Sequence, residues 1–485
     1  MIKYLIKKIF FTRWTQALTR HYLDFCKPLN HAELQRLNIF DSGWYFQQYE
    51  ISSTFDPYVH FMLYGWRYGL DMSCDLTHDK LQRLLPGYQA DTNPIKFIRK
   101  LDENSLKEFV SNFKVVNAQT SSNEEYPLKN GICLMGYFLS EIGLGQAVRN
   151  MAYAIDNACI PSSYFNIPLI SRSNDIEFRN KCGIHQDREV SMMLLGLPSI
   201  QHYVNSLKGG RLNIAYPYWE LSNIPAPWKE HLLKFDEVLA PTKFIGDALS
   251  KVLNRPIDIM PQVVRVPSSL KKLSSPSVMN ILAFLDFDSH TSRKNPKGVL
   301  DAFKLAFSIK NEDVALTVKV RGNDDEGGRD LLRKYAAHDR RIKIIDETLD
   351  RSGMDQLYAD CDVYISMHRS EGFGFGVAEA LSVGKVVIAT NYSGTTDFLN
   401  ETTGYPVAYD LVSLKKGDYP EWRDQVWANP SVDDAARILK DVHSNWQNAL
   451  AKARLGKEYV LNYHSAAAVG QTLRELLIKR GLSLK

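Results

Sequence analysis

After residue 129, short apolar runs alternate with longer segments whose apolar residues follow helical spacing. Runs that predict buried strands fall at residues 131–135, 190–195, 212–216 and 237–240. A second series falls at residues 280–285, 315–320, 342–345, 363–367 and 386–390. Strands that alternate with helices are typical of parallel, doubly wound sheets. The pattern therefore predicts an α/β fold with two domains, at residues 129–267 and 280–435.

The segments around these domains have other patterns. Residues 28–116 are rich in aromatic residues and predict a small, mainly helical module. Its aromatic side chains are expected to form a core rather than a sugar-binding platform, and they include Trp44, Tyr45, Tyr49 and Tyr64. Residues 117–128 are polar without periodicity and predict a linker. Residues 268–279 are the expected hinge between the α/β domains, and residues 436–485 are expected to be mostly helical.

Residues 1–27 predict a basic amphipathic helix. Apolar residues such as Ile2, Leu5 and Ile9 recur at helical spacing, with lysines between them. Such a helix can lie in the headgroup region of an anionic membrane, which makes residues 1–25 a candidate membrane-binding segment. It can equally dock on the core of the protein itself with its lysines in solvent. Both interpretations stay open.

Composition disfavours several classes of function. The 485 residues are 45% hydrophobic and 24% charged, as in ordinary soluble globular proteins. A net charge of +4 gives no support to a nucleic-acid partner. The six cysteines include no CxxC pair, so we expect neither a disulfide framework nor a zinc site. No apolar run is long enough to span a membrane, and no signal cleavage site follows the first apolar residues. We expect a cytoplasmic protein, peripheral on the inner face of the cell membrane if its N-terminal helix binds lipid.

Residues 368–381 contain the most informative pattern. Glu371 and Glu379 flank a glycine-rich turn that follows a predicted strand and opens a predicted helix. A strand, a glycine turn and a helix N-terminus place free backbone N–H groups where an anion can bind. Two carboxylates would repel a bare phosphate, but they can accept hydrogen bonds from the hydroxyl groups of a sugar and a ribose. The pattern therefore predicts a nucleotide-sugar site.

This segment resembles the E-x7-E signature of retaining glycosyltransferases of family 4, which have the GT-B architecture of two facing Rossmann-like domains. The resemblance extends from about residue 130 to the C-terminus. Other segments that carry it are residues 136–145 (GYFLSEIGLG), 218–221 (YWEL), 293–296 (RKNP) and 390–394 (TNYSG). It implies that the final helix crosses back onto the first α/β domain, and residues 466–479 fit that role. The module at residues 28–116 likewise resembles one found before some bacterial polysaccharide glycosyltransferases.

The resemblance also implies roles for charged residues. Lys294 matches the lysine that binds the donor diphosphate, and Arg293 is its neighbour. Members of the family commonly have an arginine five or six residues before this lysine, but this sequence has Ser289 and Asp288 there. Three residues could supply the second positive charge instead, namely Arg293, Lys319 and Arg321. We assign Glu371, Lys294 and Arg293 to catalysis, with Glu371 near the donor sugar.

Further residues are expected to bind the donor. Glu379 matches the glutamate that binds the ribose hydroxyls, and the glycine turn offers backbone amides to the sugar and phosphate. The other residues assigned to donor binding are Gly374, Phe375, Gly376, Lys319, Gly143, Gly145 and Gly394. Gly143 and Gly145 would allow close approach of the first domain's backbone to the donor.

Weaker assignments concern the acceptor and supporting positions. Glu220 could touch the acceptor, and a structural carboxylate is an equal alternative. His368 is a candidate to support Glu371. For His202 and His185, the local histidines of the first domain, an ordinary structural or surface role is favoured. The DFD motif that begins at Asp286 resembles a metal-binding motif of another glycosyltransferase architecture, but it lies in the wrong context, so we predict no metal site.

Together these features predict a retaining, metal-independent glycosyltransferase that needs no cofactor beyond its nucleotide-diphosphate sugar. Its acceptor would be a glycan or lipid-linked glycan in surface-polysaccharide synthesis. The alternatives are another GT-B enzyme, such as an epimerase or phosphorylase, and a non-catalytic glycan-binding or scaffold subunit. The presence of Glu371, Glu379 and Lys294 argues against the scaffold.

Overall fold

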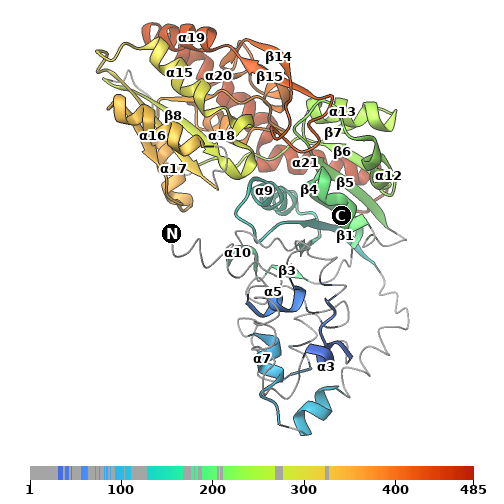
Figure 1. Cartoon of the computed structure of the whole chain (residues 1–485). Coiled ribbons are helices and arrows are strands. Elements are labelled where there is room, and N and C mark those ends of the chain that lie inside the picture. The colour runs from blue at the N-terminus through green and yellow to red at the C-terminus, as the bar shows by residue number, and fades with distance from the viewer. Residues whose placement is uncertain are drawn as a thin grey trace. The chain divides into compact units, whose positions relative to one another are not determined.

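The structure is a computed structural model, shown as a cartoon in Figure 1. It describes residues 31–36, 39–42, 45, 56–63, 72, 76, 81, 84–85, 88, 93–102, 104–110, 128–167, 176–179, 181–183, 188–204, 207, 211–267, 277–322 and 327–484. By internal contacts the chain divides into two compact units. One comprises residues 1–129, 135–145 and 163–187, and the other comprises residues 130–134, 146–162 and 188–485.

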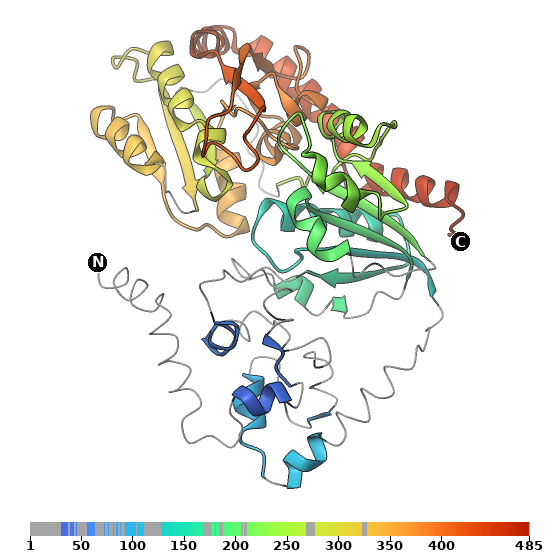
Figure 2. The ribbon, with the colours of Figure 1, turned by 45° about the vertical axis from the view of Figure 1, so that its right-hand side comes forward.

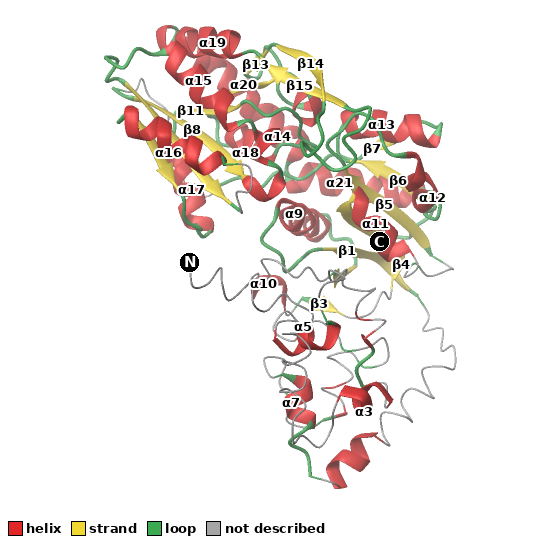
Figure 3. Cartoon of the chain, viewed as in Figure 1, coloured by secondary structure: helices red, strands yellow, loops and turns green. Residues whose placement is uncertain are grey.

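Two sheets form the frame of the α/β part, and helices flank them (Figure 3). The seven-stranded sheet has the order β3-β2-β1-β4-β5-β6-β7. Its strands are β1 (Lys129–Gly136), β2 (Ser162–Asn166), β3 (Cys182–Gly183), β4 (Arg188–Gly196), β5 (Leu212–Tyr218), β6 (Glu237–Ala240) and β7 (Asp258–Ile259). The helices among them are α9 (Gly143–Asn157), α10 (Ile176–Arg179), α11 (Leu197–Tyr203), α12 (Lys229–Leu232) and α13 (Lys243–Leu253).

The second sheet has six strands in the order β10-β9-β8-β11-β12-β13. They are β8 (Met279–Asp286), β9 (Val314–Arg321), β10 (Ile342–Ile345), β11 (Val363–Ser366), β12 (Val386–Thr390) and β13 (Tyr405–Val407). All the pairings in this sheet are parallel, which explains why its central strands are apolar on both faces. The chain order reverses between β8 and β11, and ligands of open α/β sheets bind at such a switch point.

Helices connect these strands and bury their apolar faces on the sheet. They are α14 (Thr291–Lys294), α15 (Pro296–Ala306), α16 (Gly328–His338), α17 (Arg351–Asp360) and α18 (Phe375–Ser382). Side chains from the strands, from α15 and from α19 (Val432–Ser444) form one buried core, which includes Leu316, Val363, Ile388, Phe303 and Leu439. A separate antiparallel hairpin consists of β14 (Tyr409–Ser413) and β15 (Val426–Pro430).

The last two helices extend from the second domain to the first, as the red segments of Figure 2 show. They are α20 (Trp446–His464) and α21 (Ala466–Lys479). Gly470 of α21 lies so near α9 that an added Cβ would stand 2.3 Å from the carbonyl oxygen of Ala154. Arg474 donates a hydrogen bond to the carbonyl oxygen of Ala158 at 3.2 Å. Glycine therefore permits the close packing of these two helices.

The N-terminal region contains the short helices α3 (His31–Arg36), α5 (Pro57–Leu63) and α7 (Pro94–Ile98). Its core combines aliphatic side chains with aromatic rings that pack on one another. The ring centroids of Phe40 and Tyr45 lie 5.2 Å apart, and Tyr45 and Phe61 meet edge to face at 5.7 Å. The expectation that Tyr45 is a core residue is confirmed, because its side chain is buried. Trp44, Tyr49 and Tyr64 lie outside the described residues, as do residues 1–27 and 117–127.

The predicted strands of both domains are confirmed, most closely at residues 237–240, 342–345 and 386–390, where the predicted and observed bounds agree. The helix expected at residues 466–479 is α21 with the same bounds. Most of the predicted hinge, residues 268–276, lies outside the described part of the chain, and its last residue, Met279, already begins β8.

Candidate active site

The turn between β11 and α18 can be built only with glycine. Gly374 has a φ of +93°, and a Cβ there would lie 2.4 Å from Cγ2 of Thr395. At Gly376 a Cβ would lie 2.2 Å from the hydroxyl of Tyr364. Gly374 is also the N-cap of α18 and has no side chain to satisfy the first amides of the helix. The amides of the first turn, which begins at Phe375, are therefore available to an anion.

A second loop, after β12, holds the backbone of Glu371 through hydrogen bonds. The amide of Glu371 donates to the hydroxyl of Ser393 at 2.8 Å, and the amide of Gly394 donates to the carbonyl of Glu371 at 2.9 Å. A Cβ on Gly394 would lie 2.2 Å from the carbonyl oxygen of Gly372, so the two loops touch through backbone. The assigned Gly394 thus supports the backbone of Glu371.

The carboxylate of Glu371 lies between two cations. Lys294 Nζ is 2.5 Å from Oε1, and Arg293 Nη1 is 3.1 Å from Oε2. Arg293 is buried and also lies 3.7 Å from Glu220. Burial would raise the pKa of Glu371, but Lys294 and Arg293 outweigh burial and hold that pKa well below its usual range. Burial would lower the pKa of Arg293, and Glu371 and Glu220 overcome it, so both groups are charged.

The two cations reach Glu371 because the chain turns sharply after β8. His290 and Asn295 bound helix α14 with φ values of +66° and +51°. The Asn295 side chain caps α15 by accepting from the amide of Gly298 at 3.2 Å, and it donates to the carbonyl of Met367 at 2.9 Å. These bonds tie α14 to the end of β11. Lys294 and Glu371, far apart in sequence, are therefore placed together by two neighbouring strand ends.

His368 lies in the same cluster as a neutral, structural side chain. Its ring is fully buried, and burial lowers its pKa to about 4. Its Nδ1 lies 3.0 Å from the hydroxyl of Ser366, and its Nε2 lies 3.3 Å from that of Thr395. His368 thus connects β11 to the loop that holds Glu371, and its supporting role stays a prediction.

Glu379 lies one turn into α18 and makes different contacts. It accepts a hydrogen bond from the hydroxyl of Tyr358 at 2.8 Å. Burial raises its pKa to about 7, against the opposing effects of Tyr358 and Arg265. Arg265 itself forms a bidentate ion pair with Asp355, with distances of 2.7 and 2.6 Å. Among the residues that the structure describes, no cation forms an ion pair with Glu379, and its carboxyl oxygens can accept further hydrogen bonds.

Glu220 follows β5 and brings the first domain to this cluster. Its carboxylate accepts a hydrogen bond from the hydroxyl of Tyr419, in the loop between β14 and β15. Its carbonyl oxygen accepts a hydrogen bond from Ser370. Thr242, the N-cap of α13, donates to the carbonyl of Gly372 at 3.0 Å. First-domain residues thus contact both chain neighbours of Glu371, the hydroxyl of Ser370 and the backbone carbonyl of Gly372.

The structure places the remaining predicted residues elsewhere. Lys319 is buried, and its Nζ donates to the carbonyl of Val320 at 2.8 Å. Arg321 pairs with Asp286 at 2.7 Å, because the two residues are opposite each other in the β8–β9 register. Of the three cations considered for the missing arginine, Arg293 is the one that contacts Glu371. Asp286, the first residue of the DFD motif, serves as the partner of Arg321.

Three further residues are described only locally. Gly143 begins α9, and a Cβ on Gly145 would lie 2.0 Å from the carbonyl oxygen of Ser140, which explains the need for glycine there. His202 lies on α11, and its side chain is outside the described part of the structure.

Three residues of the site, Tyr358, Ser393 and Tyr419, were not predicted from the sequence. Ser393 was within reach, because it lies in the segment TNYSG that carried the resemblance. Tyr358 and Tyr419 lie in no motif, and only the fold brings them to Glu379 and Glu220.

The cluster can stabilise negative charge without a metal ion. Lys294, Arg293 and the N-terminus of α18 converge beside Glu371 and are fixed before any ligand arrives, which is the arrangement that lowers barriers by electrostatics. Within the described ranges, no group of three or more His, Cys, Asp or Glu side chains is arranged to hold a metal ion. Metal independence itself stays a prediction.

Comparisons with known proteins bear on the family and the fold of the chain. Residues 281–416 match a family model described as glycosyl transferases group 1. A search of curated proteins found no match to this sequence. The chain is similar in structure to HepE of Anabaena in complex with UDP and glucose, with 12% identity, 72% of this chain and 100% of that chain covered, and a TM-score of 0.52.

Two other solved structures are similar over the same extent. Sucrose-phosphate synthase of Thermosynechococcus elongatus has 13% identity, covers 73% of this chain and 99% of its own, and has a TM-score of 0.54. The lipopolysaccharide outer core galactosyltransferase WaaB has 12% identity, covers 72% and 99%, and has a TM-score of 0.50. The chain spans only 55% of the length of the matched S. aureus TarM structure. Likeness at these identities shows the fold, and it confirms the predicted GT-B architecture.

Proposed function

We propose that this protein is a retaining, metal-independent glycosyltransferase that moves a sugar from a nucleotide-diphosphate donor to a hydroxyl group of a glycan or lipid-linked glycan. The observation that carries the proposal is the convergence of Lys294, Arg293 and the N-terminus of α18 on Glu371. The match of residues 281–416 to group 1 glycosyl transferases supports it. HepE was solved with UDP and glucose, which makes UDP-sugars the first donors to test.

In this proposal the diphosphate binds Lys294 and the first amides of α18. It competes with Glu371 for the ammonium group, and Glu371 is then able to accept hydrogen bonds from the donor sugar. Glu379 accepts hydrogen bonds from the ribose hydroxyls, for which Tyr358 leaves lone pairs free. As the glycosidic bond breaks, the lysine stabilises the charge on the leaving diphosphate.

Retention would follow if the acceptor attacks from the face that the diphosphate leaves, with a phosphate oxygen taking the proton of the acceptor hydroxyl. The carbon–oxygen bond to the diphosphate breaks as the bond to the acceptor oxygen forms. Arg293 and Lys294 would hold the diphosphate in place during that exchange. Glu371 forms ion pairs with both cations, and in this proposal it gives up the one to Lys294 and keeps the one to Arg293. A carboxylate that stays paired with Arg293 fits a sugar-binding role better than that of a nucleophile.

A setting in surface-polysaccharide synthesis is part of the proposal, and the fold it shares with WaaB is compatible with it. Within the described part of the chain, no helix is both long and apolar enough to cross a membrane. Membrane binding through residues 1–25 stays a proposal, because these residues lie outside the described part of the chain. Deleting residues 2–20 should release the protein from anionic vesicles and leave transfer to a soluble acceptor intact. Unchanged vesicle binding would assign that segment to the fold instead.

The test of the proposed function is donor binding followed by transfer. We would measure binding of UDP, GDP, ADP and dTDP and their sugars by calorimetry in EDTA, using the wild type and the Lys294→Ala and Glu379→Gln variants. We expect one nucleoside series to bind the wild type and to bind both variants more weakly. NMR of the product should show the anomeric configuration of the donor. If no nucleotide binds, or if the product is inverted, the proposal fails in its donor site or its stereochemistry respectively.

A further inference from the structure

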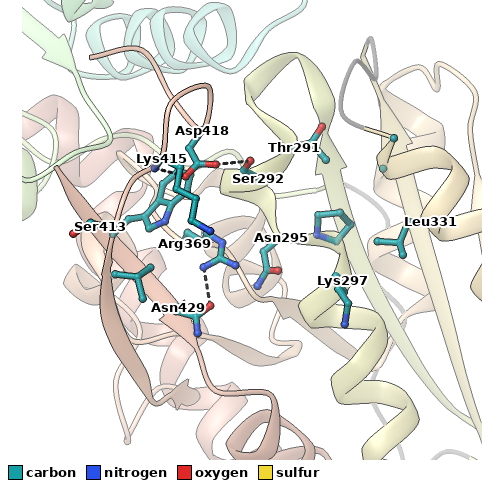
Figure 4. A pocket seen from close by; sticks show the side chains of 15 residues that line it. Thr291, Ser292, Asn295, Lys297, Leu331, Arg369, Ser413, Lys415, Asp418 and Asn429 are labelled. Carbon is teal, nitrogen blue, oxygen red and sulfur yellow. Dashed lines mark hydrogen bonds between the residues drawn. The ribbon is translucent and has the colours of Figure 1, made fainter. Parts of the chain in front are cut away.

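A cavity of about 680 Å³ lies in the second domain, and Figure 4 shows the side chains that line it. Its wall comes from the start of α14 and α15, the start of α16, and the β14–β15 hairpin together with Arg369. Its volume lies within the range of about 300–1,000 Å³ that small-molecule sites have. Neither Glu371, Lys294 nor Glu379 lines it.

Arg369 is the central cation of this cavity. Its Nη1 donates to the side chain of Asn429 at 2.7 Å, and its guanidinium lies 5.8 Å from the centre of the Trp427 ring. Among the residues that the structure describes, its Nε and Nη2 have no hydrogen-bond partner, and no carboxylate forms an ion pair with it. Burial lowers the pKa of Arg369, and Asp418 opposes this effect in part. A half-buried guanidinium with unused donors is suited to bind a carboxylate or phosphoryl group.

Lys415 supplies a second positive charge from the hairpin loop. Its side chain is exposed, and within the described ranges its ammonium group has no ion-pair partner. Among the lining residues that the structure describes, Asp418 is the one carboxylate. It accepts hydrogen bonds from the backbone amide of Lys415 at 2.7 Å and from the hydroxyl of Ser292 at 3.3 Å. The third lining cation, Lys297, pairs with Asp301, which is not in the lining. Counted over the described lining residues, Arg369 and Lys415 outweigh Asp418, and the net charge is positive.

The rest of the lining combines apolar side chains, such as Pro296, Leu331 and Val412, with polar groups that suit hydroxyl groups. It includes the hydroxyls of Thr291, Ser292 and Ser413 and the amide of Asn429. The N-termini of α15 and α16, each 11 residues long, add partial positive charge. Trp427 is only 2% exposed, so it offers no open ring for a nucleobase to stack on. Figure 4 shows Arg369, Lys415 and Asn429 on one wall, with Thr291, Lys297 and Leu331 on the other.

We propose that this cavity binds an anionic sugar, with its phosphoryl or carboxylate group between Arg369 and Lys415 and its hydroxyl groups against the opposite wall. Thr291 and Ser292 line the cavity, and the next two residues of the same helix, Arg293 and Lys294, contact Glu371. The sugar therefore binds at the back of the helix that holds the proposed donor site. Binding in this cavity does not depend on the transfer activity proposed above.

The test is calorimetric titration of the full chain with glucose 6-phosphate, glucuronate, glucose and inorganic phosphate. We expect one of the two anionic sugars to bind. Glucose and inorganic phosphate should each bind at least about tenfold more weakly, because glucose lacks the anionic group and inorganic phosphate lacks the sugar hydroxyl groups. Glucose 6-phosphate and glucuronate distinguish a phosphorylated from a carboxylated ligand.

Variants then locate the binding. Arg369→Gln and Lys415→Gln should each weaken the anionic sugar by about tenfold, and Lys415 is exposed, so its variant should fold normally. Lys416→Gln, the exposed neighbour that does not line the cavity, is the matched control and should change nothing. Lys294→Ala should also leave this affinity unchanged. If neither anionic sugar binds, if inorganic phosphate binds equally well, or if Lys294→Ala rather than Lys415→Gln abolishes binding, the proposal is wrong.

Discussion

Glu379 should reduce the stability of the folded protein at neutral pH, and replacing it with glutamine should reveal by how much. Burial raises the pKa of this carboxyl from 4.5 to about 7. Between these values the folded protein holds a proton that the unfolded chain has lost, so stability falls as the pH rises through this window. Below the window the effect is absent, and above it the effect is complete. A shift of this size corresponds to about 3 kcal/mol.

Glutamine keeps an oxygen that can accept the hydrogen bond of Tyr358 but carries no charge. Glu379→Gln should therefore raise the free energy of unfolding by up to about 3 kcal/mol at pH 8 and by about 1 kcal/mol at pH 5. Urea unfolding at the two pH values, followed by tryptophan fluorescence, measures both differences. Glu458→Gln, an exposed carboxylate on α20, is the control and should shift stability little at either pH.

A Glu379→Gln variant that is less stable than the wild type at pH 8, or equally shifted at both pH values, would refute this reasoning. A more stable variant that no longer binds nucleotide would indicate that the carboxylate is kept for binding in spite of its effect on stability.

Three further results are expected. Donor affinity of the wild type should fall about tenfold from pH 8 to pH 6, because protonation of Glu379 removes its acceptor charge, and calorimetry on Glu379→Gln should show a flat profile across that range. Lys294→Ala should lower kcat by a factor of about 10²–10³ in a transfer assay, because it removes a positive charge that stabilises the leaving diphosphate. The control Lys440→Ala on α19 should stay near the wild-type rate, and a near-normal rate for Lys294→Ala would contradict the diphosphate assignment. Gly374→Ala should lower stability by about 1–3 kcal/mol, and by more than Gly417→Ala, because both have positive φ but only Gly374 would also clash with Thr395; equal urea midpoints would exclude the clash.

The sequence predicted those features that depend on short stretches of chain. Apolar runs located the strands, and the glycine turn around Gly374 located the start of α18, because each pattern is complete within a few residues. The place of Lys294 was inferred from a resemblance, and its contact with Glu371 depends on the parallel order of β8 and β11.

Contacts between distant segments could not be predicted in the same way. Tyr419 comes from a hairpin loop, and no pattern in that loop indicates its bond to Glu220. Lys319 lies in a strand that was predicted correctly, but its role was not. Its side chain donates a hydrogen bond to the neighbouring carbonyl of Val320. The direction of a side chain at the end of a strand depends on its spatial neighbours, and the sequence pattern does not identify them.

Helix α14 has consequences for engineering this domain. Within four residues, Thr291 and Ser292 line one cavity, and Arg293 and Lys294 hold the carboxylate of Glu371. His290 and Asn295, which bound the helix, both have positive φ values. A rotation of the helix toward the cavity or toward Glu371 would require both residues to change conformation. Changes that shift the backbone of this helix to alter donor choice will therefore also alter the shape of the cavity, whereas truncating a side chain that does not line the cavity, as in Lys294→Ala, leaves that shape intact. To change the donor by transplanting this segment from another enzyme, residues 286–298 should be exchanged as one block. The carbonyl of Met367, which accepts the hydrogen bond of Asn295, should be kept in place.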